Sequence, residues 1–342
     1  TLGGFSAAEA DELRRAMGHR RKLPRLRAAL ERLYARLRAR GIEEPVAREV
    51  VRDLYGFANY GFPESHAWSF ALIAYATAYL KAHYPAEFLY GLLESWPMGF
   101  YPPATLVHDA RRHGVVVLGP CLRDGAWDCT LEPWPAGDAA GDPAREAAAA
   151  AAETPGVAVR IGWKFIRGLG ERAQEALEAA RAAGPFRSIE EIARRTGFGR
   201  AEMLHLARAG ALEAFEPGRR RAAWEALRAA GDLLPLAPAR TLPFDPRELE
   251  GPELVFLDYL ATGISTHGHP VEVLRPRLEA MGATPSHALG GFEHGAPVLV
   301  GGLVVARQHP ETARGTVFLL LEDEFGFLNI VVPRPLYARF RD

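Results

Sequence analysis

A serine, a histidine and a lysine on one expected helix carry the side chains of an anion-binding site. Residues 56–85 read GFANYGFPESHAWSFALIAYATAYLKAHYP, with Ser65 and His66 just after the first proline and Lys81 near the end. Proline at the first turn and again beyond the last turn predicts a long amphipathic helix between them. Exposed N–H groups at a helix N-terminus, beside a hydroxyl and an imidazole, suit a phosphate. These residues predict an anion site and leave its ligand open.

Three consecutive carboxylates, Glu322, Asp323 and Glu324, form the one acidic cluster near apolar strands. Two-metal phosphoryl transfer requires carboxylates that hold the ions about 4 Å apart. The cluster lies in an LEDEFG turn, however, where carboxylates are ordinarily solvated, so we expect a structural role. His108 and His113 are five residues apart and fall off one helical face. The sequence therefore predicts no catalytic carboxylates and no metal site in this chain.

A Gly-x-Gly turn occurs at Gly168-Leu169-Gly170, within IRGLGERAQEAL (166–177) and between two expected helices. Glycines let such a loop approach a ligand closely, and the amides of the next helix N-terminus can bind a phosphodiester oxygen. The pattern resembles a helix-hairpin-helix motif, so we predict DNA-backbone contacts from Arg167 and the three turn residues. ARAGALEAF, near residue 210, looks like a degenerate second copy. The alternative is an ordinary helix–helix turn that needs glycine.

The composition is that of a soluble globular protein with two or three domains: 342 residues, 48% apolar and 24% charged. Net charge is −1, but 13 Arg or Lys stand against 4 Asp or Glu between Arg14 and Arg52. Such a basic stripe can bind phosphate, or it can be a solvated helix surface. No membrane span or export signal is present. We therefore expect a cytoplasmic location and free thiols at Cys121 and Cys129.

Periodicity and capping signals predict three blocks of structure. The first is helical through about residue 118, with helices over 6–20, 23–40, 45–55, 64–82, 86–95 and 103–113. Two short strands then flank a Pro/Gly/Ala-rich linker at 135–156, within 119–162. A second helical block over 163–232 precedes a linker over 233–260. The last block, 261–342, holds a helix near 270–281 and three strands between 296 and 332.

Several of these stretches occur together in one known family. GFANYGFPESH, ESWPMGFYPP (94–103), DARRHGV (109–115) and WDCTLEP (127–133) follow the order found in bacterial C-family DNA polymerases. The chain resembles the error-prone branch of that family, relatives of the replicative polymerase alpha subunit, along its whole length. The resemblance implies a multidomain, mainly α fold. It would comprise part of the fingers domain (1–118), a tandem helix-hairpin-helix domain (163–232) and a C-terminal, incomplete β OB-fold (261–342).

The resemblance also implies nucleotide-binding residues. In the family's fingers, an arginine of the first helix and the histidine of the SH motif lie near the incoming triphosphate. Carried over, these are Arg14 and His66, with Arg15, Ser65 and Lys81 as further candidates. An arginine fork suits phosphate oxygens. The structural alternatives are an ion pair of Arg15 with its own helix and capping of the long helix by His66. Trp68 stands where the family has a small residue, which puts neighbouring contacts in doubt.

The catalytic aspartates of the family belong to a palm domain upstream of the fingers. Mg²⁺ would thus be held, in the intact enzyme, by ligands outside this chain. The implied partners are primer-template DNA, single-stranded template and deoxynucleoside triphosphates. RTLPFDP (240–246) offers Leu242 and Phe244 as anchors for a weak sliding-clamp contact, without the usual leading glutamine.

We therefore interpret the sequence as part of an error-prone, translesion-type DNA polymerase that supplies nucleotide and DNA-backbone binding. The fragment by itself is expected to be inactive. A start at Thr1 and a barrel unfinished at Asp342 favour a fragment. The alternative is a non-catalytic DNA-binding accessory protein built from the same modules. A purely structural helical protein fits the basic stripe and the Gly-x-Gly turn poorly.

Overall fold

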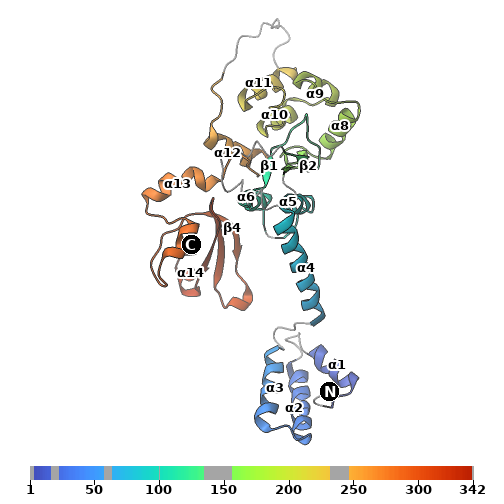
Figure 1. The fold of residues 1–342 in the computed structure, drawn as a ribbon, viewed down its shortest axis with the longest axis vertical. Coiled ribbons are helices and arrows are strands. Elements are labelled where there is room, and N and C mark those ends of the chain that lie inside the picture. Colours follow the sequence, from blue (N-terminus) through green and yellow to red (C-terminus); the bar gives the residue numbers. More distant parts are fainter. Residues whose placement is uncertain are drawn as a thin grey trace. The chain divides into compact units, whose positions relative to one another are not determined.

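The computed structural model describes residues 4–16, 23–57, 64–99, 101–134, 156–231 and 246–340. It divides into two units, Thr1–Ala78 and Tyr79–Asp342, with the boundary inside helix α4 (Figure 1). The elements of the first unit are α1 (Ala7–Ala16), α2 (Leu23–Ala39), α3 (Glu44–Phe57) and the start of α4 (Glu64–His83).

The second unit begins with α5 (Pro85–Glu94), α6 (Pro103–Arg112), β1 (Val116–Leu118), β2 (Thr130–Pro133), β3 (Val157–Arg160) and the 3-10 turn η3 (Trp163–Phe165). Then follow α8 (Glu171–Ala182), α9 (Ile189–Thr196), α10 (Arg200–Arg208), α11 (Arg219–Ala229), α12 (Gly251–Ala261) and α13 (Pro270–Ala280). The chain continues with η4 (Ser286–Gly291), β4 (Leu303–Gln308), η5 (Glu311–Ala313), β5 (Val317–Glu322), β6 (Phe327–Val332) and α14 (Arg334–Phe340).

Helices α1 to α3 form a small bundle in the first unit. The leucines of α2 at positions 26, 30, 33 and 37 are buried, as their helical spacing requires. A capping box begins the first helix: the Ser6 amide donates to Glu9 Oε2 at 2.8 Å and the Glu9 amide donates to Ser6 Oγ at 3.3 Å.

Helix α4 differs from the amphipathic helix that the sequence predicted. Its apolar side chains lie on all sides, and large ones are exposed, including Trp68 at 67% and Tyr75 at 75%. The large apolar side chains at positions 68, 72 and 75 share one face of the helix, and those at 70 and 73 lie on the opposite face, so no single face collects them. The prediction was wrong because it rested on proline punctuation rather than on the period.

A mixed sheet lies at the start of the second unit. Its order is β1-β3-β2, with β1 parallel and β2 antiparallel to β3. Leu89, Leu93 and Val107 of α5 and α6 pack with Val117 and Val159 of the strands. The helical block was predicted to run to residue 118, but 116–118 is strand β1. The structure pairs it with β3, a long-range contact that a local pattern does not show.

Helices α8 to α11 form one body (Figure 1). Leu177, Ile192, Met203 and Leu206 are fully buried in its core. Buried Trp163 ties η3 to the neighbouring loop by donating its indole N–H to the Cys121 carbonyl at 2.9 Å. Part of the predicted 233–260 linker is helix α12. A capping box between Glu250 and Glu253, with proline in the first turn, starts that helix.

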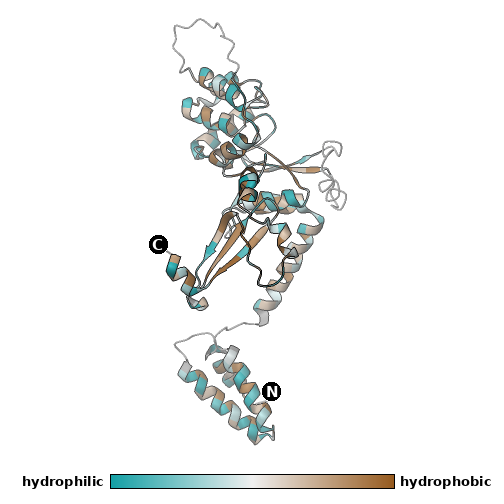
Figure 2. Cartoon of the chain, turned by 90° about the vertical axis from the view of Figure 1, so that its left-hand side faces the viewer, coloured by the Kyte–Doolittle hydropathy of each residue, from teal (hydrophilic) through white to brown (hydrophobic). Residues whose placement is uncertain are grey.

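The last elements form an antiparallel sheet in the order β4-β5-β6. Its three strands confirm those predicted between 296 and 332, although the first begins only at Leu303. Figure 2 shows that these strands are mostly hydrophobic. Both cysteines are free, as predicted, and both are buried; burial raises the pKa of Cys129 to about 12. Within the described ranges, no helix combines the length and apolar character that a bilayer crossing demands.

Candidate nucleic-acid interface

The predicted turn at Gly168 joins η3 to α8 through a tight, exposed loop. Gly168 has a φ of +90°, and a Cβ there would lie 2.4 Å from Nε2 of the His205 ring. Gly170 is extended and caps α8, with the Ala173 and Gln174 amides bonded to its carbonyl. Within the described part of the chain, the N–H groups of Glu171 and Arg172 meet no backbone acceptor. Glycine is thus needed for both the turn and the packing of α10 on it.

Arg167 is fixed immediately before this turn by the C-terminal end of α12. Its amide donates to the Ala261 carbonyl at 2.8 Å, and its Nη1 donates to the Leu260 carbonyl at 3.3 Å. A cation at a helix C-terminus is favourable, because the last carbonyls carry partial negative charge. Arg167, Gly168 and Gly170 are all exposed. The structure therefore brings the four predicted DNA-binding residues together on an accessible loop and adds α12 as their support.

A second turn of the same kind lies at Gly197-Phe198-Gly199, between α9 and α10. Gly197 ends α9 with a φ of +67°, and its amide donates to the Ala193 carbonyl at 3.0 Å. Gly199 is extended and caps α10 without a side-chain bond. Space for a Cβ at Gly197 is open, with nothing within 4 Å. Sequence reasoning missed this turn, although its Gly-x-Gly spacing is that of Gly168 and Gly170.

The stretch near residue 210 was predicted to be a second copy of the Gly-x-Gly turn, but a side chain fills the space above its glycine. Gly210 has a φ of +79°, and the Arg219 guanidinium occupies the space above it, so that a Cβ at this position would lie 2.6 Å from the guanidinium carbon. Arg219 is 5% exposed and is paired with Asp258 at 3.0 Å and Glu213 at 3.0 Å. A buried, paired arginine leaves no room for a phosphate at this glycine. Gly197–Gly199 is therefore a second open Gly-x-Gly turn in this helical body, whereas Gly210 is closed.

The predicted nucleotide-binding residues are not brought together by any contact in the described residues. The side chains of Arg14 and Ser65 lie outside what the structure describes. Arg15 is exposed and pairs with Asp11 of its own helix at 2.6 Å. This ion pair is the structural role that we gave as the alternative to nucleotide binding by Arg15. The exposed His66 ring lies 4.3 Å from the Phe70 ring. Lys81, in the second unit, donates to Asp109 at 2.7 Å.

The acidic cluster is buried, not solvated as predicted. Glu322 is 1% exposed and accepts hydrogen bonds from Thr105 at 2.9 Å and Arg112 at 3.1 Å. Asp323 is fully buried and accepts from the Ser286 amide at 2.7 Å, and bonds from Ser286 and loop amides hold its pKa below its usual range. These pairs anchor the β5–β6 turn to α6 and η4. Because their oxygens are already committed, the carboxylates do not fit a metal.

No group of three or more His, Cys, Asp or Glu in the described residues could hold a metal ion. The family's Mg²⁺ therefore has no fitting ligand set in this part of the chain. The proposed clamp anchors Leu242 and Phe244, like most of the 135–156 linker, lie outside the described residues.

A pair of buried histidines lies where α6 meets α12 and α13. His108 Nε2 is 2.7 Å from the Tyr259 hydroxyl, and the His108 and His269 rings meet edge to face at 4.7 Å. His269 Nδ1 accepts from the Val271 amide at 3.1 Å and thereby caps α13. Burial lowers the pKa of His108 to about 2 and that of His269 to about 4. Both rings are therefore neutral in the folded protein at neutral pH.

The two Gly-x-Gly turns and their helices define a helix-hairpin-helix body. A family model described as "Helix-hairpin-helix motif" matches residues 114–222, a range that includes both turns.

Curated relatives match nearly the whole chain, which spans about 30% of their own length. The chain is 46% identical over 345 residues to an error-prone DNA polymerase of Anaeromyxobacter dehalogenans (strain 2CP-C), covering 99% of the chain and 29% of that protein. It is 42% identical over 338 residues to the error-prone DNA polymerase of Burkholderia mallei (strain ATCC 23344), and this match covers 99% of the chain and 30% of that protein. The chain is 42% identical over 337 residues to the error-prone DNA polymerase of Methylococcus capsulatus (strain Bath), and this match covers 96% of the chain and 32% of that protein. The predicted resemblance is thus confirmed: the chain is homologous to a segment, about 30% of the length, of error-prone DNA polymerases.

Proposed function

We propose that this chain serves an error-prone DNA polymerase by holding the DNA backbone and facing the incoming nucleotide. The observation that carries the DNA part is the pair of exposed Gly-x-Gly turns, each followed by a helix that starts without a capping side chain. The free amides of such helix starts bind phosphate oxygens and position a duplex without reading its sequence. The whole activity, template-directed phosphoryl transfer, would also require the palm and its Mg²⁺ from the rest of the relatives' length.

The nucleotide-facing role rests on the family's fingers and on basic side chains of the first unit. Arg15 lines a surface hollow of about 620 Å³ together with Arg25 and Arg32, and with Asp11 and Glu12 of α1. Arg32 already pairs with Glu12 at 3.1 Å, at an exposed site where such a pair is weak. Triphosphate oxygens would therefore compete for these guanidinium groups at small cost. Arg14, Ser65 and His66 are assigned to the same role.

The sheet β4-β5-β6 is assigned to an OB-type module for single-stranded template. Phe318 and Phe327 are 38% and 39% exposed on its strands, and exposed aromatics on strands stack on bases in such folds. The alternative function, a non-catalytic DNA-binding accessory protein, would use the same turns. It predicts DNA binding without any dependence of polymerase activity on these residues.

The amide contact can be removed at one position without removing the helix. Glu171 is the first residue of α8 and follows an extended Gly170, so proline is tolerated there and the loss of its carboxylate is accompanied by the loss of one backbone N–H. Glu171→Ala is the matched control, because it removes the same carboxylate and keeps the amide. We expect Glu171→Pro to bind a blunt duplex about tenfold more weakly than Glu171→Ala, as fluorescence anisotropy would measure.

In the same titrations, Arg167→Gln should lower the slope of log affinity against log salt by about one unit, as for one lost phosphate contact. Equal affinities of Glu171→Pro and Glu171→Ala, with an unchanged slope in Arg167→Gln, would remove the first turn from the DNA interface.

A further inference from the structure

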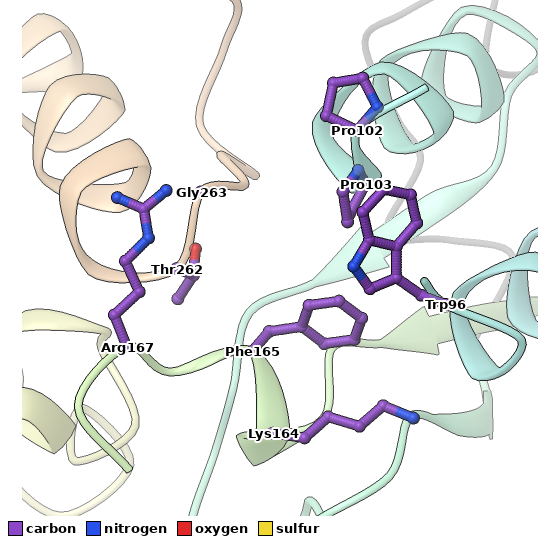
Figure 3. A pocket seen from close by; sticks show the side chains of 8 residues that line it. All are labelled: Trp96, Pro102, Pro103, Lys164, Phe165, Arg167, Thr262 and Gly263. Atoms are coloured by element: carbon purple, nitrogen blue, oxygen red, sulfur yellow. The ribbon is translucent and has the colours of Figure 1, made fainter. Parts of the chain in front are cut away.

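A hollow of about 450 Å³ lies directly beside the first Gly-x-Gly turn. It is lined by Trp96, Pro102, Pro103, Lys164, Phe165, Arg167, Thr262 and Gly263 (Figure 3). The volume is in the range of clefts that take small ligands. Arg167 belongs both to this hollow and to the DNA-binding loop, so a strand held at the loop has the hollow as its neighbour.

Two sequence stretches without a role in the site so far build this hollow. ESWPMGFYPP supplies Trp96, Pro102 and Pro103, and WDCTLEP supplies its support. Glu94 accepts from the Cys129 amide at 2.8 Å and from Lys164 Nζ at 2.8 Å, and Asp128 accepts from Lys164 at 3.1 Å. These bonds fasten the two stretches to η3, and the Lys164 amide also donates to the Trp127 carbonyl at 3.0 Å. Trp96 and Phe165 therefore lie on segments that are bonded to each other without a ligand.

The chemistry of the lining is that of an aromatic site with one available cation. Phe165 and Trp96 are half-buried, and their side chains stand on the same side of the hollow, with Arg167 opposite (Figure 3). Lys164 is neutralised by its two carboxylates. Arg167 is exposed, and in the described residues its guanidinium donates only to the Leu260 carbonyl. An occupant with a flat, apolar ring system and an adjacent negative charge would satisfy both sides.

We infer that this hollow receives an unpaired nucleotide of the bound DNA, with its base on Trp96 and Phe165 and its phosphate toward Arg167. Base–aromatic stacking tolerates any base, which suits a polymerase that copies varied template. A base within an intact duplex is already stacked and cannot enter, so the occupant comes from a single-stranded extension next to the duplex. This inference rests on the proposed DNA grip of the Gly168 turn.

The test compares a short blunt duplex with the same duplex carrying a single-stranded tail on either strand. The tail contains 2-aminopurine at successive positions, whose fluorescence falls when the base stacks. The wild-type chain should bind one tailed duplex more tightly than the blunt one and quench one tail position. Trp96→Leu and Phe165→Leu should each lose about tenfold in affinity for the tailed duplex, lose the quenching, and keep the affinity for the blunt duplex.

Phe292→Leu is the matched control, because Phe292 is 47% exposed and does not line the hollow. Phe165→Tyr keeps a ring and should restore both tail preference and quenching. If either leucine variant fails to fold, Arg167→Lys replaces it in the test, because this substitution keeps the charge and lies on the surface. Arg167→Lys should retain the quenching of the tail base but show a weaker preference for the tailed duplex.

The inference is overturned if Trp96→Leu and Phe165→Leu bind tailed and blunt duplexes with the wild-type ratio or quench the tail normally, or if Arg167→Lys keeps the wild-type preference for the tail. If Glu171→Pro still weakens binding to the blunt duplex in that case, the Gly168 turn contacts DNA and the hollow does not. The hollow would then be assigned to contacts with protein. If Glu171→Pro and Glu171→Ala bind the blunt duplex equally well, the proposed DNA contact of the Gly168 turn is itself overturned.

Discussion

The connections at Gly197 and Gly210 lie in one helical body, join helices, and contain a glycine with positive φ, yet they differ in what occupies the space above the glycine. Above Gly197 the space is open, and the following helix α10 starts without a capping side chain. Above Gly210 the Arg219 guanidinium fills it and is paired with Asp258. A glycine at such a turn therefore reports backbone geometry, whereas access for a phosphate depends on the side chain that another helix places over it.

Gly168 combines features of both. Its loop is exposed like that of Gly197, but one side of the glycine is covered by the ring of His205 from α10. The first turn is thus locked onto the helix that follows the second turn. We expect the two turns to hold a fixed spacing because α10 contacts both of them.

The largest expected effect comes from unpairing the arginine that closes the Gly210 connection. Asp258→Asn keeps the shape of the side chain but leaves the Arg219 charge buried at 5% exposure, with only the more exposed Glu213 beside it. Removing one partner of a buried pair costs about 3–5 kcal/mol. Urea denaturation at neutral pH would measure this loss.

Glu213→Gln is the control for that experiment, and it should cost about 1 kcal/mol or less, because Glu213 is 36% exposed. A loss below about 1 kcal/mol in Asp258→Asn would mean that water reaches Arg219, and the contrast with the open turn would disappear.

A smaller effect is expected from alanine at the covered turn. Gly168→Ala must keep a φ of +90° and displace the His205 ring, so it should destabilise by about 2–3 kcal/mol. Gly197→Ala has open space and a left-handed φ of +67°, so it should cost about 1 kcal/mol. Thermal or urea unfolding would rank the two.

The steric part of the Gly168 effect can be isolated in a His205→Ala background, where Gly168→Ala should cost about 1 kcal/mol less than in the wild type. If the cost is the same in both backgrounds, His205 moves aside freely and the two turns are equivalent.

The smallest and most gradual effect is the pH dependence that the buried histidine pair confers. Burial holds the pKa of His269 near 4, below its ordinary 6.5, so the unfolded chain binds more protons between those values. Stability should therefore fall as pH is lowered from about 6.5 to about 4. The raised pKa of buried Glu322 acts in the opposite direction, and comparison of variants removes its contribution.

His269→Asn keeps a capping acceptor at the start of α13 and should flatten the acid side of the stability profile. His113→Asn replaces a half-exposed histidine by the same residue and serves as the control. A profile in His269→Asn as steep as that of the wild type would show that the pair is hydrated in solution.

Much of the fold was readable from local signals. The Ser6–Glu9 capping box and the leucine spacing of α2 specify a helix and its buried face from neighbouring residues alone. The Gly168-Leu169-Gly170 turn was also found, because two glycines bracketed by helical patterns require a tight connection. The sequence could equally have indicated Gly197-Phe198-Gly199, which has the same spacing.

What the sequence could not decide depends on residues that are far apart in the chain. Strand β1 forms only by pairing with β3, some forty residues later, and Glu322 is buried only because Thr105 and Arg112 meet it. Trp96, Phe165 and Arg167 likewise come from separate stretches and form one hollow only in the folded unit.

The sequence by itself determined most of the helical segments, the resemblance to error-prone DNA polymerases and the position of the first Gly-x-Gly turn, since these depend on short-range patterns. Only the tertiary structure decided which glycine turns are open, which carboxylates are committed to ion pairs, and which aromatics meet beside the turn. The physical reason is that packing between distant segments determines which side chains are exposed and which are paired. The spacing of residues along the chain does not show which segments will pack together.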